Sequence, residues 1–468
     1  MNQVKQSARI HGLLPSVTLV PLSIRPEDQG LADTRINATA FKRPAITSRG
    51  GYQFASYYGR DKKLLVARRS FEDPLRWSIF RTPFESRKAT DPHTVSVIAV
   101  DGDGVLHLSW GMHKSILRYT HSKKPATNDE SIEFLDETAA SAVPLRRAPI
   151  TYPEFTAVPA SGDLLFMFRT GRAGNGNYHL FRWFVSERRW KALVDTANAA
   201  LPWISGKPHT PNIAISPYPT NLAFDRLNRI HVAWTWRSGN HAPDVFKGYQ
   251  SNHNVLYACS GPLTDVPTAP TWHRANGEAY ERIDESTAKP VLLLPQGSSL
   301  INTWSLTTDD RDEPLIATWF APRAAQGDHT RQYMLLRKQS EAWIAQQIGT
   351  RRAEGSGRLP ESSLNEFSMA RPVILYEDGY IIVILRDHQN GGRVTAAVKH
   401  GGDSHWDFID LTNENAGLWE PSYDVERFRK DGILSMLYQP SGLGMHSHDV
   451  YVLEWNVRDF LRVFRSRA

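Results

Sequence analysis

The stretch Val100-Asp101-Gly102-Asp103-Gly104-Val105-Leu106-His107-Leu108-Ser109-Trp110 decides the fold class of this chain. Asp and Gly between two apolar runs predict a tight β-hairpin, because such a turn needs a positive φ angle, which glycine adopts at little cost. The run after the turn is apolar on both faces, which is typical of a strand packed between neighbouring sheets. This segment therefore predicts a buried hairpin in an all-β protein.

The same unit can be read seven times along the 468 residues, with turns at 57–61, 100–104, 160–163, 225–228, 309–312, 377–379 and 430–432. Successive turns are about 40 to 85 residues apart, and repeats near this length with four strands each are typical of propellers. Most units close on a strand that carries a tryptophan, at Trp77, Trp190, Trp272, Trp343, Trp406 and Trp455. A pair of β-sandwiches or a parallel β-helix, the alternatives, would have shorter repeats.

We therefore predict one all-β domain over residues 1–468, a seven-bladed β-propeller with four-stranded antiparallel blades. The N-terminal segment, about residues 1–48, is expected to lie on the ring or to close it. The single cysteine, Cys259, excludes a disulfide within the chain and is expected to be a small buried residue in a strand.

Composition and charge narrow the choice of partners. The net charge of +6 favours anionic partners. The Lys and Arg residues are scattered, which argues against nucleic acid. The 14 Trp, 16 Tyr and 19 Phe supply faces on which sugar rings stack. We predict a monomer that binds an acidic polysaccharide or oligosaccharide and neither nucleic acid nor a membrane, since no run of about 18 apolar residues is present.

The location of the protein is left open by the sequence. The N-terminal residues before Pro15 have no apolar core of the kind found in signal peptides. We expect a cytoplasmic protein, or a secreted or periplasmic protein whose signal has been removed.

Two histidines flank the second hairpin, His93 before its first strand and His113 after its second. The hairpin returns both to the same end, where residues on adjacent strands lie about 5 Å apart. Tyr152 and Arg169 hold the same positions in the third unit. We predict that these four catalytic candidates meet at one mouth of the central channel. Two hydrogen-bonded histidines with a structural role are the alternative.

Further side chains at comparable positions are predicted to bind substrate. An Arg beside a Trp can pair with a carboxylate while the ring stacks on a sugar, although blade packing is the alternative role for a Trp. The predicted binding residues are Arg172, Asn175, Tyr218, Asn221, Trp236, Arg237, His329, Arg386 and Tyr438.

Two histidines near the C-terminal end of the chain raise the question of a metal site. His446 and His448, at i and i+2, would point to one face of a strand, but no second cluster accompanies them, and loop histidines are the simpler interpretation. We predict no cofactor for the chemistry and leave a structural Ca or Zn ion open.

The segment from His93 to Pro125, HTVSVIAVDGDGVLHLSWGMHKSILRYTHSKKP, resembles the BNR-4 propeller family. This family includes ulvan lyases and related enzymes that act on rhamnose–glucuronate linkages. Residues 152–153 with 166–171, and residues 230–237, look like the next two blades of the same pattern.

The resemblance implies a catalytic His–His pair on one blade and a Tyr and an Arg on the next. His93, His113, Tyr152 and Arg169 match those positions in order and approximate spacing, with Arg172 as an alternative to Arg169. The sialidase box Ser-x-Asp-x-Gly-x-x-Trp is missing, which disfavours a sialidase.

Three functions follow as hypotheses. In the first, the protein is a polysaccharide lyase that cleaves a uronate-containing glycan by β-elimination: an Arg (169, 172 or 237) neutralises the carboxylate, and Tyr152 with one histidine supplies the base and the acid. The second is a glycoside hydrolase such as an α-L-rhamnosidase, which normally needs two carboxyl groups, whereas Glu154 is the one acid near the third unit. The third is a non-catalytic glycan-binding propeller. We expect the first.

Overall fold

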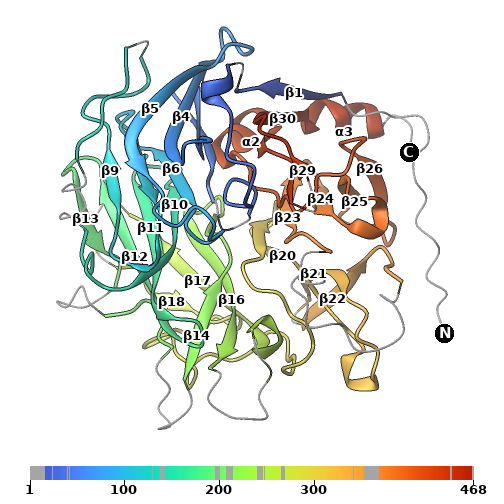
Figure 1. Cartoon of the computed structure of the whole chain (residues 1–468). Coiled ribbons are helices and arrows are strands. Elements are labelled where there is room, and N and C mark those ends of the chain that lie inside the picture. The colour runs from blue at the N-terminus through green and yellow to red at the C-terminus, as the bar shows by residue number, and fades with distance from the viewer. Residues whose placement is uncertain are drawn as a thin grey trace.

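The computed structural model describes residues 16–465, apart from positions 24, 40, 42, 129, 137–142, 195–200, 207–213, 240–245, 247, 265–268, 341, 353–367 and 443–444. Seven antiparallel sheets stand in a ring around a central channel (Figure 1). The seven-bladed β-propeller predicted from the hairpin repeats is therefore confirmed.

The strands of the first three blades follow one another from the channel outward. Blade 1 contains β2 (Ile46–Arg49), β3 (Tyr52–Tyr58), β4 (Lys63–Ser70) and β5 (Ser78–Glu85). Blade 2 contains β6 (Ser96–Val100), β7 (Leu106–Trp110) and β9 (Tyr119–His121). Blade 3 contains β10 (Ile150–Ala157), β11 (Leu164–Arg172), β12 (Asn175–Phe184) and β13 (Arg189–Ala192). The short strand β8 (His113–Ser115) pairs with β10 and so joins blade 2 to blade 3.

Blades 4 to 6 follow the same plan. Blade 4 contains β14 (Ile215–Pro219), β15 (Ala223–Phe224), β16 (Arg229–Ser238), β17 (Asn252–Pro262) and β18 (Trp272–His273). Blade 5 contains β19 (Ser305–Thr308), β20 (Pro314–Phe320), β21 (Gln332–Gln339) and β22 (Ala342–Ile348). Blade 6 contains β23 (Val373–Glu377), β24 (Tyr380–Arg386), β25 (Val394–His400) and β26 (Asp407–Asp410).

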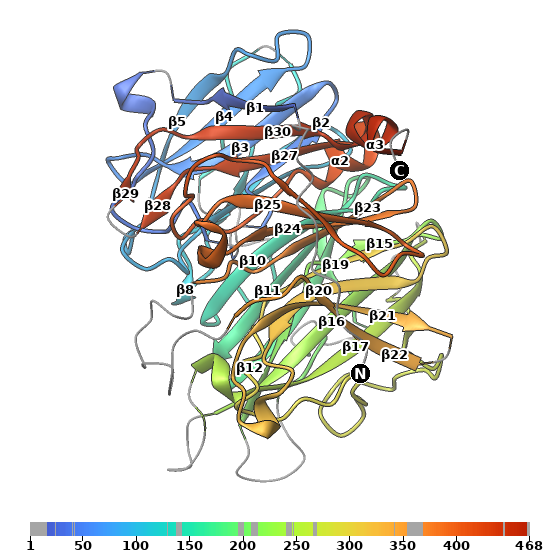
Figure 2. The same cartoon turned by 90° about the vertical axis from the view of Figure 1, so that its right-hand side faces the viewer.

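The last blade is completed by the N-terminal part of the chain. Its strands are β27 (Ile433–Tyr438), β30 (Tyr451–Asn456) and the outer β1 (Val17–Pro21), which lies antiparallel beside β30 (Figure 2). Helix α2 (Val425–Asp431) precedes β27 and α3 (Val457–Arg465) follows β30, while β28 (Ser441–Gly442) and β29 (Met445–His446) form a small hairpin. Because β1 and β30 come from opposite ends of the sequence, their hydrogen bonds close the ring.

Among the described residues, the connections carry four short 3-10 helices, η1 (Pro26–Asp28), η3 (Gly248–Ser251), η4 (Ala324–Gln326) and η5 (His388–Asn390). No helix in the described part of the chain is long and apolar enough to cross a membrane.

The strands with apolar residues on both faces, which follow the predicted turns, are generally not the innermost strands of their blades. Strands β7, β11, β16, β20 and β24 lie second from the channel, and in blade 1 the turn at Asp61 leads to the third strand, β4. In the last blade, β27 has only an isolated bridge, between Tyr423 and Met436, on its inner side. The innermost strand of a blade borders the channel, whereas the second strand packs between the two neighbouring blades, so the pattern of apolar residues on both faces belongs to the second strand. Trp77, Trp190, Trp272, Trp343 and Trp406 lie in or next to outer strands as predicted, whereas Trp455 lies on β30 because β1 covers it.

Cys259 lies in β17, as predicted, but it is half-buried rather than buried. Its part of β17 pairs with β18, which has only two residues, so the edge of the sheet is partly uncovered there.

An aspartate closes the inner hairpin in three blades, a recurrence that the sequence analysis missed. Asp101, Asp225 and Asp309 each accept hydrogen bonds from the backbone N–H groups two and four residues later. The second oxygen of Asp101 faces His107 (3.3 Å), and that of Asp225 faces His231 (3.0 Å). Burial alone would raise the pKa of Asp225, but hydrogen bonds from His231 and Arg229 lower it to about 2. The Asp225 carboxylate therefore stays ionised inside the sheet.

Asp101→Asn is expected to lower the free energy of unfolding by about 3 kcal/mol, because it weakens several hydrogen bonds to a buried carboxylate. Asp101 also accepts the Nε1–H of Trp183 in blade 3 (3.0 Å), so the change loosens the contact between two blades. Urea unfolding followed by tryptophan fluorescence measures the loss. Asp103→Asn, in the exposed part of the same turn, is the control and should change stability by less than about 0.5 kcal/mol. Equal effects of the two variants would contradict this account.

Candidate active site

The inner strands of all blades run in one direction along the channel. The end at which they begin is called the front mouth, and the end at which they finish is called the back mouth. Residues just before or early in the inner strands of blades 2, 3 and 4 meet at the front mouth. The site cluster is defined as Asp91, His93, His113, Tyr152, Arg169, Tyr218 and Arg237.

The two predicted histidines lie against each other, with ring centroids 4.3 Å apart and planes 27° from parallel. Asp91 holds both: one oxygen is 2.7 Å from Nδ1 of His93 and the other is 2.5 Å from Nδ1 of His113. An ionised carboxylate only accepts hydrogen bonds, so each Nδ1 carries a proton, and a neutral imidazole held in this way has its lone pair at Nε2. The arrangement therefore presents two imidazoles in the tautomer that a general base requires.

The charges of this group follow from burial and hydrogen bonding. Burial would raise the pKa of Asp91, but hydrogen bonds from His93 and His113 overcome this and hold it well below its usual value. Burial also lowers the pKa of His113, more than Asp91 raises it. At neutral pH, Asp91 is therefore an ionised carboxylate and His113 is a neutral imidazole.

Tyr152, Arg169, Tyr218 and Arg237 form the adjoining part of the cluster. Nη1 of Arg169 donates to the Tyr218 hydroxyl (2.7 Å), and Nη1 of Arg237 approaches the same oxygen at 3.4 Å. The Arg169 guanidinium also lies 4.8 Å from the Tyr152 ring centroid. Blades 3 and 4 thus place two phenols and two guanidinium groups in one contact network.

The pKa values of the two phenols, Tyr152 and Tyr218, are shifted in opposite directions. Burial, together with the neighbouring Tyr218, raises the pKa of Tyr152 to about 12. Burial acts the same way on Tyr218, but Arg169 and Arg237 outweigh it and lower the pKa of Tyr218. Tyr152 is thereby kept protonated at neutral pH.

The backbone at Tyr152 is also unusual. Its φ angle is 58°, in the left-handed region that non-glycine residues rarely adopt, and the register of β10 against β11 shifts between Thr151 and Glu154. Strain of this kind collects at functional sites, where the surrounding structure enforces it.

The walls of the site come from residues that the sequence analysis missed. Phe41 stacks on His93 with centroids 5.0 Å apart, and the Arg371 guanidinium lies 4.7 Å from the Phe41 ring centroid. Arg371 is buried, and its Nη1 donates to both carboxylate oxygens of Glu420 (2.8 and 3.0 Å). Oδ1 of Asn302 accepts a hydrogen bond from Nη2 of Arg237 (2.7 Å). One residue of the site that the sequence analysis missed could have been found from the sequence, namely Asp91, a carboxylate two residues before His93.

The remaining predicted binding residues separate into two groups. Arg172 and Asn175 face each other at the exposed tip of the β11–β12 hairpin, and His329 is exposed between β20 and β21. These three lie on the rim of the front mouth rather than in the cluster.

The other four predicted residues make packing and hydrogen-bond contacts outside the site cluster. Trp236 is buried against Trp234, and Tyr438 packs edge-on against Trp419. Arg386 is fully buried and donates to the Trp419 carbonyl (3.1 Å). Asn221 bonds both the N–H and the C=O of Leu306 (3.0 and 2.9 Å), which ties blade 4 to blade 5. We therefore leave these residues out of the site.

Asp91, His93 and His113 are also the one group among the described residues whose ligand atoms lie close enough for a metal ion, all within 4.8 Å. A metal at the two Nδ1 atoms would replace the hydrogen bonds to Asp91. Of the other predicted histidines, His448 hydrogen-bonds the Gly30 carbonyl (2.9 Å), and the side chain of His446 lies outside the described residues.

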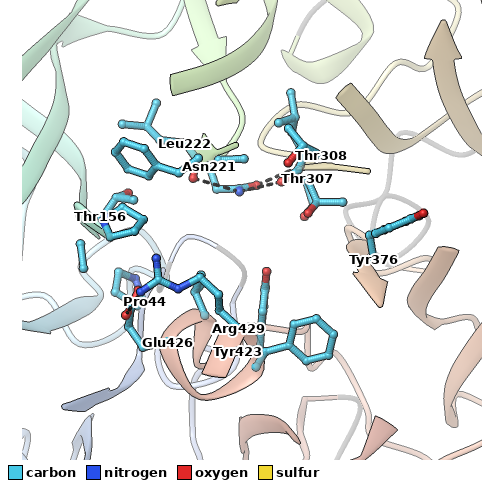
Figure 3. Close-up of a pocket in the computed structure, with 18 of the residues that line it drawn as sticks. Pro44, Thr156, Asn221, Leu222, Thr307, Thr308, Tyr376, Tyr423, Glu426 and Arg429 are labelled. Atoms are coloured by element: carbon cyan, nitrogen blue, oxygen red, sulfur yellow. Dashed lines mark hydrogen bonds and ion pairs between the residues drawn. The ribbon is translucent and has the colours of Figure 1, made fainter. Parts of the chain in front are cut away.

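The channel opens widely at the back mouth, into a cavity of about 980 Å³. Figure 3 shows Tyr423 and Arg429 on one side of this cavity and Asn221, Thr307 and Thr308 on the other. Arg43 and Glu154 line it as well, and they also line a smaller cavity beneath Tyr152. The large cavity and the site cluster therefore lie at opposite ends of the channel.

The architecture and the cluster define the structural class of the protein: it is a seven-bladed propeller with a candidate site of His, Tyr and Arg side chains at one mouth of the channel. The chain belongs to the BNR repeat-containing family, whose model matches residues 52–351. The resemblance found in the sequence is confirmed by this match.

Solved structures share the fold at low sequence identity. The polysaccharide lyase Uly1 is 14% identical with a TM-score of 0.66, over 95% of this chain and 99% of that one. A PL25 ulvan lyase, also solved bound to -[GlcA(1-4)Rha3S]-, is 14% identical with a TM-score of 0.63, over 95% and 99% of the two chains. No curated protein sequence matches. At this identity the likeness shows the fold alone.

Proposed function

We propose that this protein is a polysaccharide lyase that cleaves a uronate-containing polysaccharide, of the rhamnose–glucuronate type, by β-elimination. The observation that carries the proposal is that one cluster holds imidazoles oriented to accept a proton and a phenol that keeps its proton. Asp91 orients two imidazoles as proton acceptors, and Tyr152, with its pKa raised to about 12, remains a proton donor. Groups whose environments separate their pKa values in this way suit a base and an acid.

The reaction needs three tasks from the cluster. The α-proton of a uronate becomes acidic enough only when the carboxylate charge is neutralised, and Arg169 and Arg237 supply the positive charge. A histidine Nε2 takes the C5 proton, and the released electron pair forms the C4–C5 double bond. The C4–O4 bond then breaks, and the Tyr152 hydroxyl gives its proton to O4.

The site fits hydrolysis less well. Glycoside hydrolases normally use two carboxyl groups on either side of the scissile bond. In the site cluster, the carboxylate of Asp91 is engaged by both histidines. Glu154 lies beneath Tyr152 and pairs with Arg43 at 3.4 Å. Neither is placed as a free carboxyl in the front mouth.

The test is to incubate the protein with ulvan, glucuronan and gum arabic and to follow the absorbance of the unsaturated uronate product. Chromatography of the products separates the alternatives, since free rhamnose with a saturated glucuronate would mean hydrolysis. Binding of these glycans without any product would favour the non-catalytic propeller. The lyase proposal is wrong if folded protein forms no unsaturated product from any uronate glycan.

Arg237→Gln is expected to lower kcat/KM by about 10²-fold, because one of two charges that neutralise the uronate is lost. Arg237 is half-buried, with its guanidinium 4.3 Å from the Tyr218 ring centroid. Initial rates over a range of substrate concentrations measure the effect. The control is Arg172→Gln on the exposed rim, for which a change below about tenfold is expected. A larger loss for Arg172→Gln than for Arg237→Gln would place the uronate at the rim instead.

A further inference from the structure

Glu154 lies between the two cavities of the channel. It follows the register shift in β10 and is only 8% exposed. It lines the large cavity of the back mouth and also the cavity beneath Tyr152, whose volume is about 10 Å³. The walls of the small cavity include Arg43, Tyr152 and Tyr178. Glu154 is therefore the acid that connects the back mouth with the site cluster.

The small cavity is polar and about the size of one water molecule. A site of roughly 10–15 Å³ can hold a water when it offers two or more polar partners. Nε of Arg43 is buried without a hydrogen-bond partner among the described residues, and Nη2 of Arg43 lies 3.4 Å from Oε2 of Glu154. Tyr178 stands opposite Arg169 in the β11–β12 ladder. A proton can thus pass from Glu154 toward the cluster by way of this cavity.

The charge state of Glu154 is suited to proton exchange. Burial raises its pKa to about 7, and Arg43 is the charged group that acts against this. The other titratable groups at the small cavity are Tyr152 and Tyr178, for both of which burial raises the pKa. Near neutral pH, Glu154 is therefore the group in this cavity that both gains and loses a proton.

On the side of the back mouth, the charged residues of the cavity wall sit on the blade turns, on α2 and on α3. They are Asp225, Arg226, Asp309, Asp310, Glu377, Asp378, Glu426, Arg429, Arg458 and Arg462. Protons can reach Glu154 from solvent through this wide opening.

We propose that Glu154 is a positioning residue that returns a proton to Tyr152 after each cleavage and is itself reprotonated from the back mouth. This inference rests on the proposed lyase function. Cleavage moves the C5 proton to a histidine and the Tyr152 proton to O4, which leaves an imidazolium and a phenolate. The polysaccharide covers the front mouth at that moment, so the phenolate cannot draw a proton from there.

The protons balance over one turnover. Glu154 gives a proton through the small cavity to the Tyr152 phenolate, which is downhill because the carboxylic acid is the stronger acid. The carboxylate then takes a proton from water in the back mouth. The imidazolium releases its proton to solvent when the product leaves, so no net proton is consumed.

The test compares Glu154→Gln, which keeps the shape but carries no exchangeable acid, with Glu154→Asp, which keeps the acid. Thr156→Val, two residues along the same strand and also on the channel wall, is the matched control. Glu154 must be protonated to act, so in the wild type kcat should fall as pH rises through about 7. Glu154→Gln should lower kcat about tenfold or more, leave KM unchanged and remove this alkaline limb, whereas Glu154→Asp should retain it.

Each outcome decides the inference. The relay is overturned if Glu154→Gln keeps the wild-type kcat and pH profile. It is also overturned if Glu154→Gln, Glu154→Asp and Thr156→Val lose kcat equally and melt at lower temperatures, because the residues would then have a structural role. If Glu154→Gln fails to fold, Glu154→Asp decides, since a profile without the alkaline limb contradicts the relay. A wild type that forms no unsaturated product overturns the proposed function itself, whereas an active wild type with an unchanged Glu154→Gln overturns only the relay.

Discussion

Tyr152→Phe is expected to lower kcat by about 10²- to 10⁴-fold, the usual contribution of a general acid or base. The change removes one hydroxyl and keeps the ring, which lies 4.9 Å from Phe41 and 5.8 Å from His93 between centroids. Packing in the front mouth therefore stays the same, and the loss reports on proton donation to O4. Because the pKa of Tyr152 is raised to about 12, the hydroxyl is fully protonated throughout the pH range of an assay. Rates under saturating substrate measure kcat directly.

Tyr218→Phe is the matched comparison for this variant. Arg169 and Arg237 both point at the Tyr218 hydroxyl, so its removal loosens the two guanidinium groups that we propose neutralise the uronate. We expect a rise in KM and a smaller loss in kcat than for Tyr152→Phe. If Tyr218→Phe abolishes turnover while Tyr152→Phe remains active, the acid is Tyr218, and the assignment to Tyr152 is wrong.

The sequence predicted the architecture because each turn carries its own local signal. Turns rich in Asp and Gly between apolar runs predict hairpins one at a time, and their repetition, with tryptophans in or next to most outer strands, leaves few folds to choose from. The segment 430–432 is the exception, since Gly432 ends helix α2 instead of turning a hairpin. The same signal does not tell which strand of a blade lies inside. That depends on how sheets converge around the axis, and the turn at Asp61 accordingly lies one strand further out than the others.

The site was only partly predictable because loop position does not fix the direction of a side chain. Trp236 and Arg237 are adjacent in β16, yet the tryptophan is buried in the sheet packing while the arginine reaches Tyr218. Successive side chains in a strand point to opposite faces, so one position decides between the two roles. Arg386, in β24, is fully buried and bonds the backbone carbonyl of Trp419.

Asn302, Arg371 and Glu420 were missed for a different reason. They come from blades 5 and 6 and from the segment before the last blade, where no motif marks them, and they act through contacts between blades. Asn302 positions Arg237, and Glu420 pairs with Arg371. Only ring closure brings such groups to the walls of the front mouth.

Asp91→Asn is expected to lower kcat by about 10²-fold or more, through the tautomers of the two histidines. Asp91 now accepts Nδ1–H from both rings, whereas the amide that replaces it has one accepting oxygen and one donating NH₂ group. The ring that faces the NH₂ group must keep a lone pair at Nδ1. Its proton then sits on Nε2, where it prevents that histidine from accepting the C5 proton.

The loss of kcat in Asp91→Asn also has an expected dependence on pH. Hydrogen bonds from the histidines hold the pKa of Asp91 well below its usual value, so the wild-type carboxylate stays ionised through the acidic range of an assay. The loss in Asp91→Asn should therefore appear at every pH and should not be recovered by raising the pH. Asp103→Asn, an exposed acid in the turn of the same blade, is the control and should keep wild-type kcat.

A double-mutant cycle with His113→Ala separates orientation from a general electrostatic effect. If Asp91 acts by orienting His113, replacing Asp91 costs far less once that imidazole is gone, so the two losses are not additive. Fully additive losses would mean that the carboxylate acts on the substrate by itself. Wild-type kcat in Asp91→Asn would remove the basis for assigning the proton acceptor to either histidine.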